Sequence, residues 1–305
     1  MTETKKDFID LTQFNKDELI FLIEDGINKK NTSAKNGMAS VDEDTCAKDK
    51  ILATIFEKPS TRTRFSFETA MYQLGGKTIY ANMSDMQLGR GETIDDTAKV
   101  ISRYVDIAML RTNKHSTLEN FAKNASIPVI NGLTDKSHPC QVLADLITVK
   151  EKIGDIENKS YVWFGPANNM LTSWIHAAQI IGFELRICSP KDYSVDNNLV
   201  SGFPNIITDL NPNDAAKDCD CIITDTWFSM GEDDNDKKRK ILEPYRVDAN
   251  KISMASSDAI FLHCLPAHRG EEVDADVIDG VNSVVWDEAE NRVHAQKSII
   301  RWCLS

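Results

Sequence analysis

The feature that most constrains this chain is the alternation of short apolar, β-type runs with segments of helical spacing along nearly its whole length. In segments such as 95–104, 142–152 and 171–181, apolar residues recur every three or four positions, which is typical of amphipathic helices. Strands that alternate with helices at these separations indicate βαβ units and parallel sheets. The predicted strands are 51–56, 77–81, 106–110, 127–130, 160–164, 184–188, 219–224, 259–263 and 283–286.

This alternation predicts an α/β chain of two Rossmann-like domains, each a parallel sheet flanked by helices, with a ligand cleft between them. The length of 305 residues suits two domains of about 150 residues each. A helix over 138–152 is expected to join a first domain, 1–137, to a second domain, 153–286. The last segment, 287–305, has apolar residues at helical spacing and is expected to form a helix that packs back on the first domain.

The composition excludes several classes of partner. With 35 Lys and Arg against 47 Asp and Glu, the net charge is -12, whereas nucleic acids and anionic membranes require a basic face. No apolar run approaches the ~20 residues of a membrane span, and the N-terminus lacks the apolar stretch of a secretory signal. Seven scattered cysteines are typical of reduced thiols in a cytoplasmic chain. Cys219 and Cys221 alternate along an apolar run and are expected in the core, and no metal or cofactor is predicted.

The strongest local signal is the segment Ser60-Thr-Arg-Thr-Arg64, which follows an apolar strand where the next helix should begin. The hydroxyls of Ser60, Thr61 and Thr63 can cap the helix and leave its backbone N–H groups free for an anion. Arg62 adds a bidentate fork for phosphate or carboxylate. Because Arg62 and Arg64 are two residues apart, one is expected to bind the ligand and the other to brace the domain. Taken alone, the segment also fits a capped helix with solvated arginines, although an anion site is the favoured interpretation.

Three further segments place polar side chains at predicted strand ends. His138 and Gln141, in a His-Pro-Cys-Gln turn, can donate hydrogen bonds to one carbonyl oxygen, although a capping histidine is an equal alternative. Asp225 follows a buried strand, where open α/β sheets bind ligands, and its carboxylate suits an amino group. Cys264 follows another strand and is a nucleophile, a base or an inert buried thiol. By contrast, the charge run at 232–240 mixes signs and is expected to be a solvated loop.

Taken together and in order, these motifs resemble those of the aspartate/ornithine transcarbamylase family, and in particular its ornithine branch. The resemblance covers nearly the whole chain and rests on STRTR at 60–64, HPCQ at 138–141, DTWFSMG at 225–231 and HCLP at 263–266. It implies that 1–137 binds carbamoyl phosphate and that 153–286 binds ornithine. One departure is Pro166 after Gly165, where the family usually has Gly-Asp. Since proline stiffens the turn and cannot donate, the loop geometry before Asn169 is in doubt.

The resemblance also implies the site residues. Arg111, His138 and Cys264 are the expected catalytic residues, and Gln87 is expected to reach a neighbouring subunit's site in a homotrimer or a multiple of trimers. Ornithine is expected to contact Asn169, Asp225, Ser229 and Met230. Carbamoyl phosphate is expected to contact Ser60, Thr61, Arg62, Thr63, Gln87, Arg111, His138, Gln141, Cys264, Leu265 and Arg292.

The implied reaction is transfer of the carbamoyl group from carbamoyl phosphate to the δ-amine of L-ornithine, giving L-citrulline and phosphate, with ordered binding and domain closure. The amine must attack unprotonated although its free pKa is about 10.4, so a Cys264 thiolate is one candidate aid. Two alternatives remain open: transfer to another amine such as putrescine or aspartate, and a non-catalytic regulator that binds phosphate metabolites. The residues do not distinguish arginine synthesis from arginine breakdown.

Overall fold

The computed structural model describes residues 5–33, 37, 39–87, 91–228 and 235–305. The chain divides into two compact units: the first is Met1–Ala144 with Glu290–Ser305, and the second is Asp145–Ala289. Each unit is built on one all-parallel sheet flanked by helices, which confirms the α/β class predicted from the alternating sequence pattern. Among the described residues, none of the helices combines the length and the apolar character needed to cross a bilayer.

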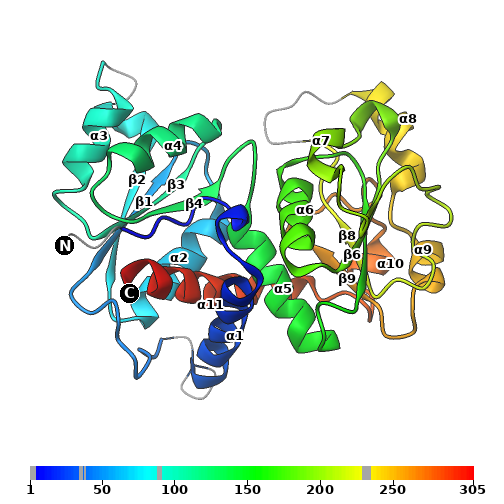
Figure 1. Ribbon diagram of the computed structural model, residues 1–305, viewed down its shortest axis with the longest axis horizontal. Helices are drawn as coiled ribbons and strands as arrows, with labels where there is room; N and C mark the ends of the chain where they lie inside the picture. Colours follow the sequence, from blue (N-terminus) through cyan, green and yellow to red (C-terminus); the bar gives the residue numbers. More distant parts are fainter. Residues whose placement is uncertain (1–4, 34–36, 38, 88–90, 229–234) are drawn as a thin grey trace. The chain divides into compact units, whose positions relative to one another are not determined.

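The first unit has a four-stranded sheet in the order β2-β1-β3-β4. The strands are β1 (Ile51–Phe56), β2 (Lys77–Asn82), β3 (Ile107–Arg111) and β4 (Val129–Leu133), and the helices are α1 (Lys16–Ser33), α2 (Thr61–Gln73), α3 (Ile94–Ile101) and α4 (His115–Asn124). On one face, Ala98 of α3 and Phe121 of α4 pack with Ile55 and Leu110 of the strands. Figure 1 shows α2 on the opposite side of this sheet from α3 and α4.

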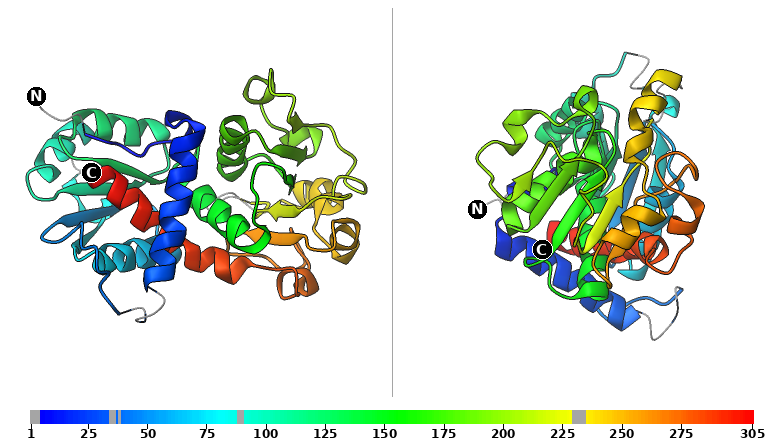
Figure 2. Two further views of the ribbon diagram at one scale, coloured as in Figure 1. Left: turned by 60° about the horizontal axis from the view of Figure 1, so that its bottom comes forward. Right: turned by 90° about the vertical axis from the view of Figure 1, so that its right-hand side faces the viewer.

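The last helix, α11 (Val285–Leu304), packs against α1 within the first unit (Figure 2). Ser298 Oγ donates to the Leu22 carbonyl at 2.9 Å, and Arg301 pairs with Asp25 at 3.2 Å. In addition, the Lys297 ammonium is buried against Asp42, 2.9 Å from both carboxylate oxygens. These polar contacts add to the apolar packing of α11, whose residues from Glu290 onward belong to the first unit.

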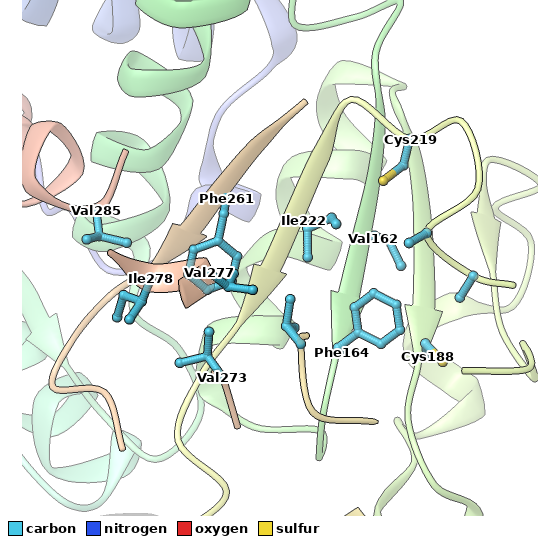
Figure 3. Packing of buried hydrophobic residues seen from close by; sticks show 13 residues of the cluster. Val162, Phe164, Cys188, Cys219, Ile222, Phe261, Val273, Val277, Ile278 and Val285 are labelled. Carbon is cyan, nitrogen blue, oxygen red and sulfur yellow. The ribbon is translucent and has the colours of Figure 1, made fainter. Parts of the chain in front are cut away.

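The second unit has a five-stranded sheet in the order β7-β6-β5-β8-β9. The strands are β5 (Ser160–Phe164), β6 (Glu184–Cys188), β7 (Ile206–Ile207), β8 (Cys221–Thr224) and β9 (Ile260–His263). Figure 3 shows Val162, Ile222 and Phe261 from three neighbouring strands in one core layer with Cys219. Cys219 and Cys221 are fully buried, as their apolar alternation predicted. The helices are α5 (Pro139–Ile153), which spans the boundary between the units, α6 (Asn169–Ile181), α7 (Asn197–Val200), α8 (Asp236–Leu242), α9 (Ala249–Met254) and α10 (Ala275–Ile278).

Two local predictions were wrong, and one short strand was not predicted. The predicted strand at 283–286 reduces to one bridge between Ser283 and Phe261, because Val285 already begins α11. The two-residue strand β7, at the sheet edge, is too short to give a period-two signal. Part of the charge run is helical, since Asn235 caps α8 by accepting from two backbone N–H groups. Residues 232–234 of that run lie outside the described residues.

Candidate active site

Both sheets place candidate side chains at the carboxyl ends of neighbouring strands. In each unit the strand order reverses direction once, between β1 and β3 in the first unit and between β5 and β8 in the second. Open α/β sheets bind ligands at such switch points, because the loops leaving the two central strands diverge there. Each sheet therefore positions its own group of candidate side chains.

In the first unit the turn after β1 leads into the capped N-terminus of α2, which is the candidate anion-binding position. Ser60 is the N-cap of α2, and its Oγ accepts from the Thr63 backbone N–H at 3.3 Å and donates to Thr63 Oγ1 at 3.1 Å. Arg111 ends β3, directly opposite Phe56 in the register, and its Nη1 donates to Thr63 Oγ1 at 3.3 Å. The structure thus brings Ser60, Thr63 and Arg111 together, with Arg111 only 8% exposed.

The two arginines of the STRTR segment have different environments, as predicted. Arg64 braces the domain: its Nε donates to Glu68 at 2.9 Å, and its guanidinium stacks 4.0 Å from the centroid of the Tyr80 ring. Arg62 lies on the other side of the helix, close enough to His138 to lower the pKa of that imidazole. A helix with 3.6 residues per turn separates the two side chains, so Arg62 is the ligand-binding candidate.

His138 is buried within the electrostatic reach of three arginines, Arg292, Arg111 and Arg62. Burial, followed by the charges of Arg292, Arg111 and Arg62, holds the pKa of His138 well below its usual range. The imidazole is therefore neutral at physiological pH, which leaves one nitrogen as a donor and the other as an acceptor. Gln141, one helical turn further on, accepts from Arg292 Nη1 at 2.5 Å. The turn over 138–141 and the distant Arg292 thus form one buried group.

Two of the predicted contacts in the first unit are exposed rather than buried. Thr61 is exposed on the first turn of α2. Gln87 is also exposed; its backbone carbonyl accepts from Glu92 N at 3.3 Å, and within the described residues no hydrogen bond joins its side chain to the buried group around His138.

In the second unit three strand-end loops meet at Asp225. Asn168 caps α6 through Oδ1, which accepts from the backbone N–H groups of Met170 and Leu171, and its Nδ2 donates to Asp225 at 2.8 Å. The other carboxylate oxygen of Asp225 accepts from Cys264 Sγ at 3.2 Å. The structure therefore brings together residues that follow β5, β8 and β9. Asn169, the predicted ornithine contact, is the first residue of α6.

Cys264 carries its proton in this arrangement. Burial first, and then the negative charges of Asp225 and Glu288, raise the pKa of the thiol well above its ordinary value. Because a carboxylate only accepts, the short contact with Asp225 also requires an S–H donor. Of the roles that the sequence left open for Cys264, the geometry favours a thiol that donates to Asp225 over a thiolate base.

Sequence reasoning missed two buried residues that support Cys264. His263 Nε2 lies 3.2 Å from Glu272 Oε1, and its Nδ1 accepts from the Leu265 backbone N–H at 2.9 Å. This contact accompanies a left-handed backbone at Leu265, φ +57°, which is rare for a residue with a side chain. His263 was visible in the HCLP motif, but only the fold reveals that Glu272, which is fully buried, is its partner.

The turn that carries Pro166 has a defined geometry. Gly165 adopts φ +121°, which favours glycine, and its N–H donates to the Cys188 carbonyl at 3.2 Å. One residue after the proline, Ala167 N donates to the Tyr193 carbonyl at 2.8 Å. The proline is thus accommodated between two backbone contacts immediately before Asn168. The predicted ornithine contacts Ser229 and Met230 lie outside the described residues.

Two groups of side chains have the donor types that metals prefer. Asp225, His263 and Cys264 form one, and His268, Glu271 and Glu272 form the other; within each, one ligand atom per residue lies within 4.8 Å of the others. In the first group the thiol and carboxylate are already joined by a hydrogen bond, which is the arrangement of a pair that shares a proton. In the first group Asp225 lies on a different loop from His263 and Cys264, so spacing along the chain does not predict that group.

Comparison with known proteins matches both halves of the chain to one family. Residues 6–151 match the aspartate/ornithine carbamoyltransferase carbamoyl-P binding domain, and residues 157–303 match the aspartate/ornithine carbamoyltransferase Asp/Orn binding domain. The chain therefore belongs to the aspartate/ornithine carbamoyltransferase family.

Within that family, the similar proteins are named ornithine carbamoyltransferases. The enzyme of that name from Caulobacter vibrioides is 50% identical over 304 residues, covering 97% of this chain and 96% of its own. Among solved structures, ornithine carbamoyltransferase from Pyrococcus furiosus has a TM-score of 0.91 at 42% identity, covering 98% of this chain and 97% of its own. The anabolic enzyme from Campylobacter jejuni has a TM-score of 0.89 at 39% identity, covering 98% of each chain.

Proposed function

We propose that this chain transfers the carbamoyl group from carbamoyl phosphate to the δ-amine of L-ornithine, giving L-citrulline and phosphate. The observation that carries the proposal is the neutral His138, buried among Arg62, Arg111 and Arg292 beside the capped start of α2. Three cations around one uncharged imidazole suit a ligand that combines a phosphate with a polarised carbonyl. The full-length similarity to ornithine carbamoyltransferases supports the same reaction.

The phosphate would be held by the start of α2. Ser60, Thr61, Arg62 and Thr63 supply hydroxyls, a guanidinium and backbone N–H groups at the positive end of the helix dipole. As the bond from carbon to the phosphate oxygen breaks, negative charge grows on the leaving phosphate. The same donors then bind the leaving group more tightly than the substrate, which lowers the barrier.

The carbonyl oxygen would be held by Arg111, His138 and Gln141, with Arg292 fixing the Gln141 amide through its 2.5 Å contact. These groups stabilise the charge that develops on oxygen when the amine attacks. A neutral imidazole is an effective donor here because it adds no further positive charge to a site with three arginines. Loss of one such donor typically costs about a hundred- to a thousandfold in rate. The Leu265 backbone and Cys264 are further proposed contacts of carbamoyl phosphate, and Gln87 would serve a neighbouring copy's site.

The amino acid would be held by Asn169, Asp225, Ser229 and Met230. Asp225 has the charge to take the α-ammonium group, while the amide of Asn169 suits the carboxylate. The Cys264 thiol, which donates to Asp225, would orient that carboxylate rather than remove a proton from the amine. No metal or organic cofactor has a step in this scheme.

We further propose a cytoplasmic homotrimer, or a multiple of trimers, with shared sites. In support, the first unit exposes an apolar surface on α2 and on the edge strand β2, where Phe65 is 67%, Tyr72 52% and Ile79 50% exposed. Large exposed apolar side chains on neighbouring elements mark interaction surfaces.

The test is citrulline formation from carbamoyl phosphate and L-ornithine, with putrescine and L-aspartate assayed beside it. Turnover with ornithine alone is expected. Arg62→Ala should lower kcat/KM by about a hundredfold or more, whereas Arg64→Ala, the matched control on the same helix, should change it by less than about threefold. Turnover only with another amine would contradict the acceptor, and phosphate-ligand binding without turnover would favour a regulator. Sedimentation of the same preparation measures the assembly.

A further inference from the structure

A buried lysine in the second unit is enclosed by aromatic rings. Lys238, in the first turns of α8, is only 7% exposed, and its Nζ lies 5.1 Å from the ring centroid of Tyr193 and 5.0 Å from that of Phe228. The guanidinium of Arg239 lies 5.2 Å from the same Phe228 ring. We call Tyr193, Phe228, Lys238 and Arg239 the cation–aromatic cluster. Buried cations on aromatic faces gain more than exposed ones, because water no longer competes.

Three members of the cluster are each connected to a different strand-end loop of the second unit. Phe228 follows Asp225 by three residues on the loop after β8. The backbone carbonyl of Tyr193 accepts from Ala167 N at 2.8 Å, on the turn that leads to Asn168.

Arg239 connects the cluster to the loop after β9. Arg239 donates from Nε and Nη2 to Glu271 at 3.2 and 2.9 Å. The next residue, Glu272, contacts the His263 ring that accepts from Leu265 N. Through these contacts the cation–aromatic cluster links the loops after β5, β8 and β9 at a second position, in addition to their meeting at Asp225.

We infer that the cation–aromatic cluster positions the amino-acid half of the site and that Phe228 is its central positioning residue. The inference rests on the proposed function, and it adds a determinant of acceptor affinity that touches neither substrate. The Asp225 carboxylate binds an ammonium group well only if its loop is held in place before the ligand arrives, because ordering a loop on binding costs affinity. Phe228 provides that restraint through two cations anchored on α8.

The inference predicts a split between the two substrates. The residues assigned to carbamoyl phosphate at the start of α2 belong to the first unit, whereas every member of the cluster belongs to the second. Replacing Phe228 with leucine keeps an apolar side chain but removes the π face. We therefore expect Phe228→Leu to raise the KM for ornithine by about tenfold, within the range of cation–aromatic interactions, and to change the KM for carbamoyl phosphate by less than about twofold.

The matched variants are Phe228→Tyr, which keeps the ring and should restore the wild-type KM, and Phe203→Leu, which alters a 37% exposed phenylalanine of the same unit and should have no effect. Lys238→Met completes a double-mutant cycle, in which the two substitutions together should cost less than the product of their separate effects. An unchanged ornithine KM in folded Phe228→Leu would overturn the inference. So would equal changes in both KM values, or independent effects in the cycle.

A second readout separates this inference from the proposed function. Trp227, the residue before Phe228, is buried. The near-ultraviolet circular dichroism of the protein therefore includes a signal from this loop, and it can be recorded without any enzyme assay. Phe228→Leu should reduce that signal and Phe203→Leu should leave it unchanged. If wild-type protein forms no citrulline, the proposed function fails while this signal still tests the cluster. An unchanged signal in Phe228→Leu would overturn the positioning role.

Discussion

At the scale of single residues, the chemistry of this chain depends on protonation states that burial sets. His138 is kept neutral by burial and by three guanidinium groups, and Cys264 is kept protonated by burial and by two carboxylates. Both shifts follow the same rule, since low polarity and like charge disfavour the ionised form. The residue types alone, a histidine and a cysteine at strand ends, are compatible with the opposite states.

The Cys264–Asp225 hydrogen bond gives a prediction at this scale. Cys264→Ala should lower kcat/KM for ornithine by about ten- to a hundredfold, because a hydrogen bond to a charged group is lost. Cys264→Ser keeps a donor and should recover most of the rate, while Cys46→Ala, at an exposed thiol, should have no effect. The wild-type pH profile of kcat/KM should show no thiolate limb below pH 9. Full loss of activity in Cys264→Ser would indicate a thiolate base instead.

At the scale of elements, α11 has contacts that only its position in the fold explains. Within the second unit, Glu288 in its first turn accepts from His263 N at 2.9 Å. Further along, Arg292 donates to Gln141, and Lys297 is paired with Asp42 in the core of the first unit. Helical spacing predicted the helix and its apolar face but none of these polar partners, because each comes from a distant part of the sequence.

The buried pair of Lys297 and Asp42 predicts a large effect on stability. Lys297→Met should lower the free energy of unfolding by about 3 kcal/mol, because it leaves the Asp42 carboxylate buried without its cation. Lys29→Met is the control, since its partner Asp44 is half exposed and the pair should contribute less than about 1 kcal/mol. Urea denaturation followed by circular dichroism measures both. Equal losses for the two variants would show that burial of the pair does not matter.

At the scale of the whole molecule, buried neutral histidines couple folding to pH. His138 has a pKa well below its usual range, and burial lowers the pKa of His294, on α11, to about 3. When a histidine pKa is lower in the folded chain than the ordinary 6.5, the unfolded chain binds more protons below pH 6.5. The contribution to stability is therefore complete above pH 6.5 and is lost as the pH falls toward the folded pKa.

His294→Gln tests the contribution of His294 to this coupling, because a glutamine side chain does not bind a proton in this pH range. Between pH 6 and pH 4 the wild-type free energy of unfolding should fall faster than that of His294→Gln, by about 1.4 kcal/mol per pH unit. Urea titrations at several pH values measure the two slopes. Parallel slopes would contradict the lowered pKa of His294, whatever the absolute stability of the variant.

Local sequence patterns were enough to predict the α/β class, most of the strands, the capped start of α2 and the different environments of Arg62 and Arg64. These features depend on local periodicity, capping and the number of residues per helical turn, all of which are written in neighbouring residues. The motifs at 138–141 and 263–266 were also visible, so the candidate residues could be named before their geometry was known.

The environments of these residues depend on the packing of the fold. The protonation of His138 and Cys264, the support of His263 by Glu272, the burial of Lys297 and the cluster around Phe228 each join residues from separate elements. Burial and distance set these properties through desolvation and Coulomb interaction, which no spacing along the chain encodes. Local secondary structure can therefore be predicted from neighbouring residues, whereas the electrostatics of the site depend on how the sheets and helices pack.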